Sequence, residues 1–343
     1  MDLVSEIREK LKALESDSSF DGISAAIRHI EVAERHLKRA RYENEEDFFN
    51  DVIYRTNQSF EGMLKEAYTV LTGRDGTKLS SYQIEQHLLD QKVFTQRVLD
   101  IFTNYRQNWR NPSTHDHKLL FSEQEAFLAI VNISAFAIIL LDQIIESVNF
   151  KRELEKVERN EETIKKEIKD YKNLRFDEQL ISLITAFNNY IKSSEMNLGE
   201  IKEIEILGRL QGFLSSLDDS IKIIREPIIS QEKHYRADLV LKKGNEEVIV
   251  ELKRAWKKEL GFYRALDQMQ AYLESGDFNR GILYFYPTET GQEFTIGKIE
   301  LKFEEKKPYL YIIMPKGKDY KDIINKMMNK YTEIKIKKFL SET

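Results

Sequence analysis

The sequence is short of the residues that form disulfides, thiolate metal sites and flexible linkers. It contains no cysteine, which excludes disulfide bonds and thiol-ligated zinc and fits a reducing compartment. Five prolines in 343 residues, with 41% hydrophobic and 32% charged residues, indicate a globular, helix-rich chain rather than a disordered one. A glycine-rich phosphate loop and internal repeats are both missing, so we expect neither an intrinsic ATPase nor a repeat array.

A long apolar run is also missing, because the longest one is shorter than a bilayer span. It covers residues 126–141 and contains Asn132 and Ser134. We expect a central bundle helix or a buried subunit contact here, and no association with a membrane. The start of the chain, residues 1–6, is acidic and leads straight into an amphipathic helix, which predicts a cytoplasmic protein without a secretion signal.

Residues 235–254 are typical of two β-strands joined by a two-residue Gly-Asn turn. Such a turn pairs Lys243 with Glu246, and the same register places Asp238 opposite Glu251. Opposed carboxylates lie about 5 Å apart at Cβ and repel each other, so a divalent cation between them would relieve the repulsion. The other face of the hairpin is apolar and predicts a core, since it carries Leu239, Leu241, Val248, Val250 and Leu252.

Lys253 adds an ammonium group beside these carboxylates. It follows Glu251 by two residues, so a strand points both side chains to the same side. Carboxylate-bound Mg²⁺ next to a lysine is suited to phosphodiester hydrolysis, because the metal acidifies its bound water and the lysine stabilises developing negative charge. The alternative for Asp238 and Glu251 is an ordinary solvent-exposed hairpin face.

The pattern of Asp238, Glu251 and Lys253 resembles that of the PD-(D/E)xK nuclease superfamily, with Ala237 where the family usually has proline. The resemblance implies a restriction-endonuclease-like α/β fold with a mixed sheet. It implies that Asp238 and Glu251 bind Mg²⁺ or Mn²⁺ and that Lys253 is the catalytic lysine. The family often adds an acid on the preceding helix and a glutamine on the following one.

Two flanking helices supply the further residues that the resemblance implies. Upstream, residues 198–214 have helical periodicity, and Glu205 is the predicted helix acid, with Glu203 close behind. The downstream helix resembles the family's Gln-x-x-x-Tyr helix, which implies Gln268 at the site and Tyr272 as a packing residue.

A second signal lies in the first half of the chain, where Arg110, Asn111 and His115 fall between two expected helices. Pro112 disfavours a helical Asn111, so the first helix should end near Arg110, and Ser122 is typical of the N-cap of the next helix. An arginine can hold phosphate oxygens, and a histidine can take the proton of a ribose 2′-OH.

This spacing resembles the R-N-x-x-x-H motif of the HEPN ribonuclease domains, which are all-α bundles. The resemblance implies metal-free RNA cleavage in which Arg110 stabilises the phosphorane, His115 is the general acid/base and Asn111 orients them. Because the family's site usually forms where two protomers meet, a homodimer or higher oligomer is implied. The alternative is structural, with Arg110 satisfying the end of its helix and His115 capping a neighbouring helix.

Charge is divided unevenly between the two halves of the chain. Residues 1–150 carry 17 lysines and arginines against 24 acidic residues, whereas residues 151–343 carry 36 against 34. We therefore expect phosphate binding in the second half, where the basic stretch 253–258 contains Trp256 beside the predicted site. The alternative for this stretch is an ordinary solvated loop.

These observations predict a multidomain protein in three parts: an all-α HEPN-like bundle at 1–150, a solvent-exposed connecting helix at 151–174 and a PD-(D/E)xK domain at 175–343. The predicted function is Mg²⁺-dependent cleavage of DNA with metal-free cleavage of RNA, and family analogy suggests defence against foreign nucleic acid. Two alternatives stay open: a DNase whose helical domain only dimerises or binds a partner, and a non-enzymatic nucleic-acid-binding subunit. No sequence feature identifies a sensor or ATPase partner.

Overall fold

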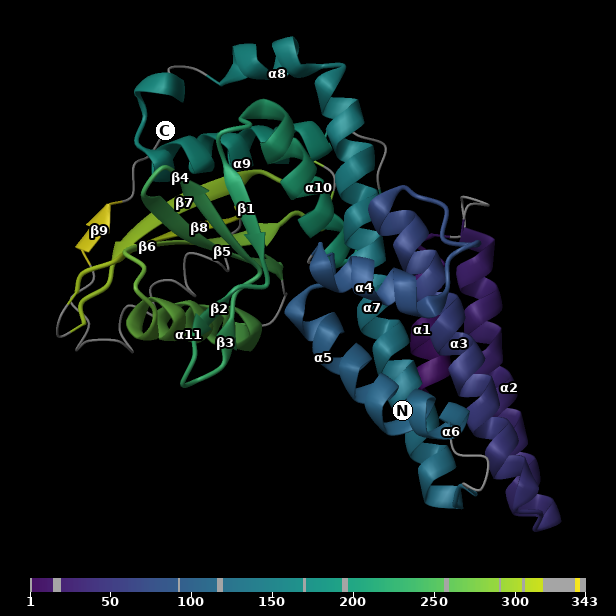
Figure 1. Cartoon of the computed structure of the whole chain (residues 1–343). Coiled ribbons are helices and arrows are strands. Elements are labelled where there is room, and N and C mark those ends of the chain that lie inside the picture. Colours follow the sequence, from purple (N-terminus) through teal and green to yellow (C-terminus); the bar gives the residue numbers. More distant parts are fainter. Residues whose placement is uncertain are drawn as a thin grey trace. The chain divides into compact units, whose positions relative to one another are not determined.

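The chain folds into two compact units, Met1–Val148 and Asn149–Thr343, in a computed structural model (Figure 1). The described residues are 2–14, 20–91, 93–115, 120–168, 171–192, 197–255, 259–289, 291–303, 306–316 and 337–339. The division lies close to the boundary expected at residue 150, and it falls inside one long helix, α7 (Glu123–Glu158).

The first unit is helical throughout its described residues, as the sequence predicts. Its helices are α1 (Leu3–Leu11), α2 (Asp21–Glu43), α3 (Asp47–Thr72), α4 (Ser81–Asp90), α5 (Gln96–Tyr105), the π-helical η2 (Arg106–Arg110), α6 (Asn111–His115) and α7. Phe60 of α3 stacks on Phe102 and Tyr105 of α5, with ring centroids 5.2 and 4.8 Å apart. Phe136 of α7 lies 5.4 Å from the same ring, so aromatic packing ties three helices into one core.

The helix expected to end near Arg110 instead continues through Pro112 to His115. The reason lies in η2, a π-helical turn in which the Asn111 N–H bonds to the carbonyl of Arg106, five residues back. A proline clashes with the carbonyl four residues earlier in a regular α-helix, and the wider π turn displaces that carbonyl. The prediction that Arg110 and His115 lie in a loop is therefore wrong.

Helix α7 occupies the core position expected for residues 126–141. Among the described residues it is the one helix long and apolar enough to cross a membrane by length and composition. In this structure 61% of its most apolar window is buried, which is typical of the central helix of a bundle. Its fully buried residues include Ala126, Ile133, Phe136, Ala137 and Leu140.

The second unit contains a mixed sheet, within the described residues, of seven strands in the order β1-β4-β5-β6-β8-β7-β9. These strands are β1 (Lys222–Arg225), β4 (Leu239–Lys243), β5 (Glu246–Arg254), β6 (Arg280–Tyr286), β7 (Phe294–Glu300), β8 (Tyr309–Pro315) and β9 (Lys337–Phe339). The central strands β5, β6 and β8 are parallel, and the outer pairings are antiparallel. A short hairpin pairs β2 (Ile228–Ser230) with β3 (Tyr235–Arg236).

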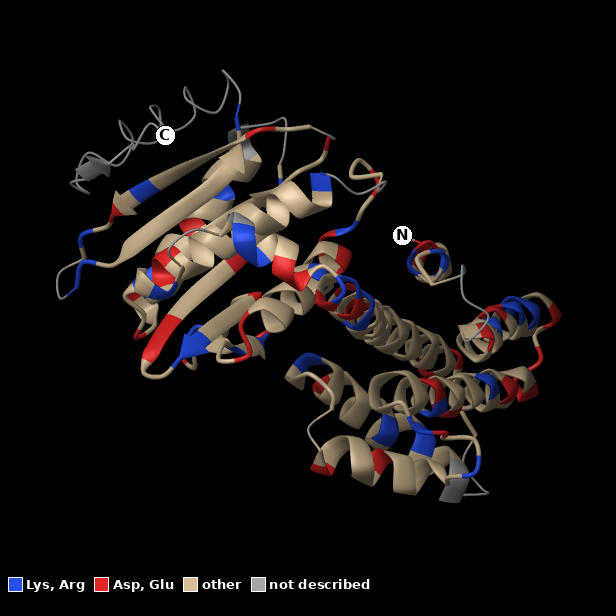
Figure 2. Cartoon of the chain, turned by 90° about the horizontal axis from the view of Figure 1, so that it is seen from above, with Lys and Arg blue, Asp and Glu red and all other residues tan. Residues whose placement is uncertain are grey.

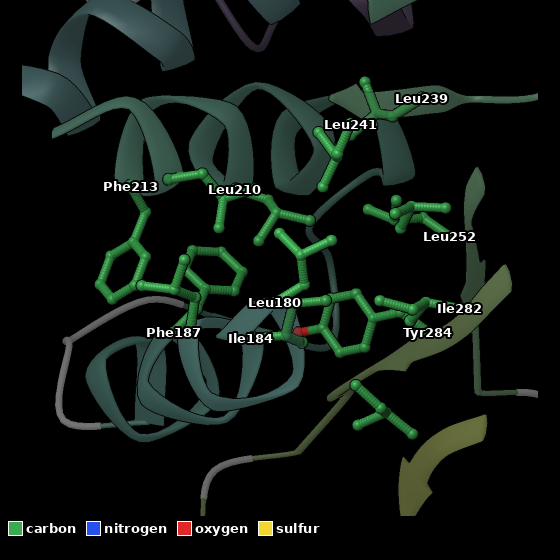
Figure 3. Packing of buried hydrophobic residues seen from close by; sticks show 14 of the residues in the cluster. Leu180, Ile184, Phe187, Leu210, Phe213, Leu239, Leu241, Leu252, Ile282 and Tyr284 are labelled. Carbon is green, nitrogen blue, oxygen red and sulfur yellow. The ribbon is translucent and has the colours of Figure 1, made fainter. Parts of the chain in front are cut away.

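Helices cover both faces of this sheet, and they are α8 (Glu161–Glu167), α9 (Phe176–Lys192), α10 (Glu203–Leu217) and α11 (Glu259–Ser275). Helices α9 and α10 pack on one face through a cluster that includes Leu180, Phe187, Leu210, Leu252 and Tyr284 (Figure 3). Helix α11 packs on the other face, where Met269 meets Val240 and Ile249. Each large apolar side chain buried in these clusters contributes about 1.5–3 kcal/mol of hydrophobic free energy.

The β4–β5 hairpin has the register that the sequence predicts, with Lys243 opposite Glu246 and Leu239 opposite Val250. Its predicted apolar face, which carries Leu239, Leu241, Val248, Val250 and Leu252, lies in the α9–α10 cluster. The middle of the opposite face is buried too, because Val240 and Ile249 there belong to the cluster under α11. The alternative of a solvent-exposed charged face is therefore wrong for this hairpin.

The segment 151–174 is part of the second unit rather than an exposed connector. Val157 and Ile164 are buried in the α9–α10 cluster. Glu153 of α7 pairs with Arg209 of α10 at 2.8 Å, and a Cβ added at Gly212 would lie 2.5 Å from a carbonyl oxygen of α7. Close packing on α10 thus fixes the end of α7.

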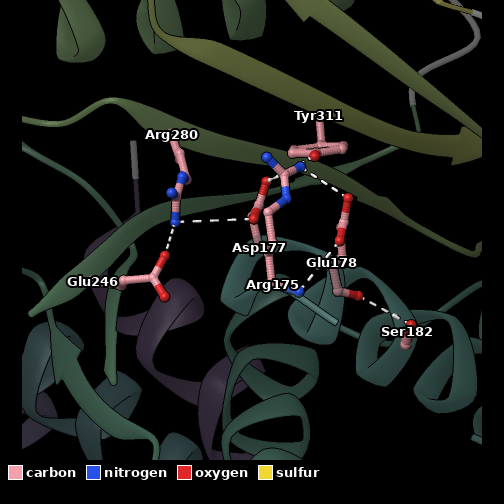
Figure 4. A network of polar contacts seen from close by, with 7 residues as sticks. All are labelled: Arg175, Asp177, Glu178, Ser182, Glu246, Arg280 and Tyr311. Carbon is pink, nitrogen blue, oxygen red and sulfur yellow. Dashed lines mark hydrogen bonds and ion pairs between the residues drawn. The ribbon is translucent and has the colours of Figure 1, made fainter. Parts of the chain in front are cut away.

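A polar network anchors the start of α9 to the N-terminal ends of the central strands (Figure 4). The Tyr311 hydroxyl donates to Asp177 Oδ2 at 2.8 Å, and Arg175 lies 3.3 Å from the same oxygen. Arg280 joins this buried aspartate to Glu246. Because Glu246 and Arg280 begin β5 and β6, the network lies at the N-terminal ends of these strands, which leaves their C-terminal ends for a site.

Candidate active site in the second unit

Asp238 and Glu251 meet at the end of the β4–β5 hairpin that is farthest from its turn. The Asp238 N–H donates to Glu251 Oε2 at 3.1 Å, and the Leu252 N–H donates to Asp238 Oδ2 at 2.7 Å. Each carboxylate thus accepts a backbone hydrogen bond from the opposite segment. Glu251 is only 1% exposed, on a strand favoured by its run of β-branched residues. The structure brings together the two acids that the register predicted.

The ammonium group of Lys253 and the amide of Gln268 both donate hydrogen bonds to Glu251. Lys253 Nζ donates to Glu251 Oε1 at 2.7 Å, and Gln268 Nε2 donates to the same oxygen at 2.8 Å. Lys253 lies on β5, and Gln268 projects from α11, which covers this face of the sheet. Tyr272 is more than the predicted packing residue, because its hydroxyl contacts Gln268 and the Arg236 carbonyl.

Burial dominates the electrostatics of these groups. It raises the pKa of Glu251 to about 7, with the charge of Asp238 adding to the rise and Lys253 opposing it. Burial also raises the pKa of Asp238, again against Lys253. Burial alone would lower the pKa of Lys253, because it disfavours the charged ammonium. The carboxylates of Asp238, Glu251 and Glu203 outweigh this effect and raise the pKa of Lys253. Negative charge is therefore in excess, which favours binding of a cation.

The helix acid that interacts with this site is Glu203, not the predicted Glu205. Burial raises the pKa of Glu203, and its charge interacts with Lys253 and with Asp238. Glu205 instead accepts the backbone N–H of Lys202 at 3.2 Å, which caps the helix. Helix α10 begins later than the periodicity predicts, so Glu205 falls at the third helical position, where glutamate commonly caps.

Glu226 is a further acid near the site that the sequence pattern did not single out. It has a φ of 44°, a backbone conformation that residues other than glycine rarely adopt. Its N–H donates to the Asp238 carbonyl at 3.0 Å, and its charge adds to the raised pKa of Asp238. The only sequence signal for its place is the following Pro227, which marks a turn but not a site.

The two central acids fit Mg²⁺ by the chemistry of their oxygen donors. Mg²⁺ usually binds one or two carboxylates and keeps several water molecules, so Asp238 and Glu251 can supply its protein ligands. Over the part of the chain that the structure describes, no group of three or more histidine, aspartate or glutamate side chains is arranged to hold a metal ion. Water and substrate oxygens would therefore complete the coordination.

Basic and acidic residues are interspersed along both units, so the charge of the second unit is not concentrated on one helix (Figure 2). Near the site, Arg254 donates to the Gly199 carbonyl, which ties the end of β5 to the loop before α10. Residues 256–258 of the predicted basic stretch, with Trp256, lie outside the described residues.

The first unit holds a separate polar cluster around η2. Arg110 donates to Asn111 Oδ1 at 3.2 Å and lies 3.5 Å from Glu61 Oε1. Arg106 forms an ion pair with the buried Glu85. Burial raises the pKa of Glu85, while the two arginines act to lower it. Both guanidinium groups therefore have carboxylate partners within the bundle.

Asn57 of α3 links this cluster to α6. Its amide donates to Ser113 Oγ at 2.7 Å, and its oxygen accepts the Tyr105 hydroxyl at 3.1 Å. The structure thus places the predicted Arg110 and Asn111 side by side in a polar part of the bundle. The side chain of His115, the last residue of α6, lies outside the described residues.

No protein-family model, curated protein or solved structure matches this chain. The geometry of the two polar clusters therefore carries their functional interpretation.

Proposed function

We propose that the second unit hydrolyses phosphodiester bonds of DNA with Mg²⁺ as its cofactor. The observation that carries the proposal is that the Asp238 N–H and Lys253 Nζ both donate to the Glu251 carboxylate, which brings these three residues together. The position of these groups supports it, because ligands of open α/β sheets bind at the carboxyl ends of parallel strands. The resemblance to PD-(D/E)xK nucleases points to the same activity.

The chemistry of each side chain sets its role. Asp238 and Glu251 would hold Mg²⁺, which when bound acidifies a water molecule and neutralises charge on the phosphate. Lys253 keeps its proton because carboxylates surround it, so it acts as a cation that stabilises the oxygens of the attacked phosphate. Glu203 helps to hold Lys253 in place through the attraction between their charges.

The test is cleavage of DNA and of RNA by the full chain, with Mg²⁺ or with EDTA. We expect DNA to be cleaved only with Mg²⁺, and Asp238→Asn to reduce the rate by about 100-fold or more while the protein stays folded. Glu232→Gln, on the exposed turn of the β2–β3 hairpin, is a matched control that should keep wild-type activity. DNA cleavage that survives EDTA, or that Asp238→Asn leaves unchanged, would contradict the proposal.

A second, metal-free activity on RNA is proposed for the first unit. The observation that favours it is the π-helical turn at Arg106–Arg110, because such turns are rare and frequently occur at functional sites. Arg110 would hold the phosphate, Asn111 would orient it and His115 would exchange protons with the ribose 2′-OH. The family resemblance adds a homodimer. EDTA-resistant cleavage that leaves 2′,3′-cyclic phosphate ends, lost in His115→Ala, is the expected result.

A further inference from the structure

Tyr272 is nearly buried, with 3% of its surface exposed, and its hydroxyl makes two hydrogen bonds. The hydroxyl donates to the backbone carbonyl of Arg236, and it contacts Nε2 of Gln268. A carbonyl oxygen can only accept, so the single hydroxyl proton is committed to Arg236. The hydroxyl must therefore accept from Gln268, and this requirement fixes which end of the Gln268 amide is the NH₂ group.

The fixed amide determines which oxygen of Glu251 is occupied. With its NH₂ group held by Tyr272, Gln268 can only donate to Glu251, and it does so at Oε1, where Lys253 also donates. A carboxylate oxygen has two lone pairs, so these two donors fill Oε1. Oε2 accepts one hydrogen bond, from the Asp238 N–H, and keeps a second lone pair.

The same hydroxyl also ties α11 to the backbone that leads into Asp238, because Arg236 precedes that acid by two residues. A rotation of Glu251 about its side-chain bonds would break its bonds with both Lys253 and Gln268. A shift of the segment before Asp238 would break the bond with Tyr272. The hydroxyl therefore restrains both acids, although it touches neither.

We propose that Tyr272 is a positioning residue for the metal site: through Gln268 it turns Glu251 Oε2 toward Asp238, and through Arg236 it holds Asp238 in place. The inference rests on the proposed metal-dependent function. Partners that orient metal-binding carboxylates in this way usually change metal affinity by about 10–100-fold when they are removed. The sequence alone assigned Tyr272 to packing, which a phenylalanine would perform equally well.

The test is the affinity of the full chain for Mn²⁺, measured by isothermal titration calorimetry and by the electron paramagnetic resonance signal of free Mn²⁺. We expect Tyr272→Phe and Gln268→Met each to weaken Mn²⁺ binding by about 10-fold or more. The double variant should lose less affinity than the sum of the two single losses, because part of the effect of Tyr272 passes through Gln268. DNA cleavage should recover at saturating Mg²⁺ in Tyr272→Phe, so that the metal requirement rises while the maximal rate holds.

Tyr284→Phe is the matched control. It removes a buried hydroxyl from β6, one that donates to Asn188 at 2.6 Å on the face of the sheet opposite α11. It should lower stability to a similar degree and leave Mn²⁺ affinity unchanged. If Tyr272→Phe and Gln268→Met bind Mn²⁺ as tightly as wild type, the positioning role is wrong while the metal site stands. If wild type itself binds no Mn²⁺, the proposed function fails, and this inference fails with it.

Discussion

The backbone N–H of Asp238 donates to Glu251 Oε2 at 3.1 Å, so two acids that repel each other are nevertheless joined across the hairpin. Burial raises the pKa of Glu251 to about 7 and also raises that of Asp238. Hydrogen bonds from backbone, lysine and amide groups keep the carboxylates in place, but they do not remove the excess of negative charge. The hairpin thus holds both acids, and we expect a divalent cation between them to stabilise it.

Glu251→Gln should stabilise the metal-free protein at high pH. Because the pKa of Glu251 rises from its ordinary 4.5 to about 7 on folding, stability is lost as pH rises through this range, and the loss is complete above it. A glutamine cannot ionise, so we expect a gain of about 1–3 kcal/mol near pH 8 and almost none at pH 4.5. Urea unfolding in EDTA measures the difference. A variant less stable than wild type near pH 8 would show that the charged carboxylate of Glu251 does not destabilise the folded protein.

Glu203→Gln and Glu205→Gln should separate the site from the helix cap. Glu203 interacts with Lys253, so its replacement should lower the rate of DNA cleavage by about 10-fold or more. Glu205 caps the helix through Lys202, so its replacement should reduce stability by roughly 0.5–1 kcal/mol and leave the rate near wild type. Cleavage rates and thermal unfolding of both variants decide the assignment. The reverse pattern would restore Glu205 as the helix acid.

Asp218 should make stability depend on pH in the acid range. Burial acts to raise its pKa, but bonds from Lys243, Ser220 and Tyr171 outweigh this and lower it to about 2. The stabilisation is therefore present above its ordinary pKa of 3.8 and is lost as pH falls from there to about 2. Asp218→Asn should cost about 1 kcal/mol at neutral pH and flatten the acid limb of the unfolding curve. An acid limb as steep as that of wild type would rule out this role.

Arg106→Ala and Arg110→Ala should behave differently although the two arginines share one helical turn. Removing Arg106 leaves the buried Glu85 without its ion-pair partner, so we expect a loss of about 3–5 kcal/mol in stability. Glu61, which faces Arg110, is 44% exposed at its side chain, so Arg110→Ala should cost less than about 1 kcal/mol. It should, however, remove EDTA-resistant RNA cleavage. RNA cleavage that persists in Arg110→Ala would leave the polar cluster with a structural role only.

Local patterns with one physical cause could be predicted from the sequence. The Gly-Asn turn fixed the register of the hairpin, and that register brought Asp238 opposite Glu251. The apolar run at residues 126–141 predicted the core position of α7. In each case neighbouring residues along the chain determine the outcome, so an alternating or helical pattern is sufficient information.

The errors arose where distant parts of the chain or rare backbone geometry decide the structure. A π-helical turn lets the helix continue through Pro112, and no residue pattern in the sequence predicts that turn. Tertiary packing buries Val157 and Ile164 in a segment whose charge pattern is typical of an exposed helix. The residue at which α10 begins determines whether Glu203 or Glu205 is the helix acid of the site. Apolar periodicity predicts the middle of a helix better than its ends.

The most direct test of the proposed activity is the rate at which Lys253→Met cleaves DNA at saturating Mg²⁺. Methionine keeps most of the packing of lysine but carries no charge, so it removes the cation that we assign to the attacked phosphate and leaves both metal-binding acids in place. We predict a rate lower than that of wild type by about 100-fold or more even at saturating Mg²⁺. Cleavage by Lys253→Met at the wild-type rate would contradict the assignment of this site as the active site.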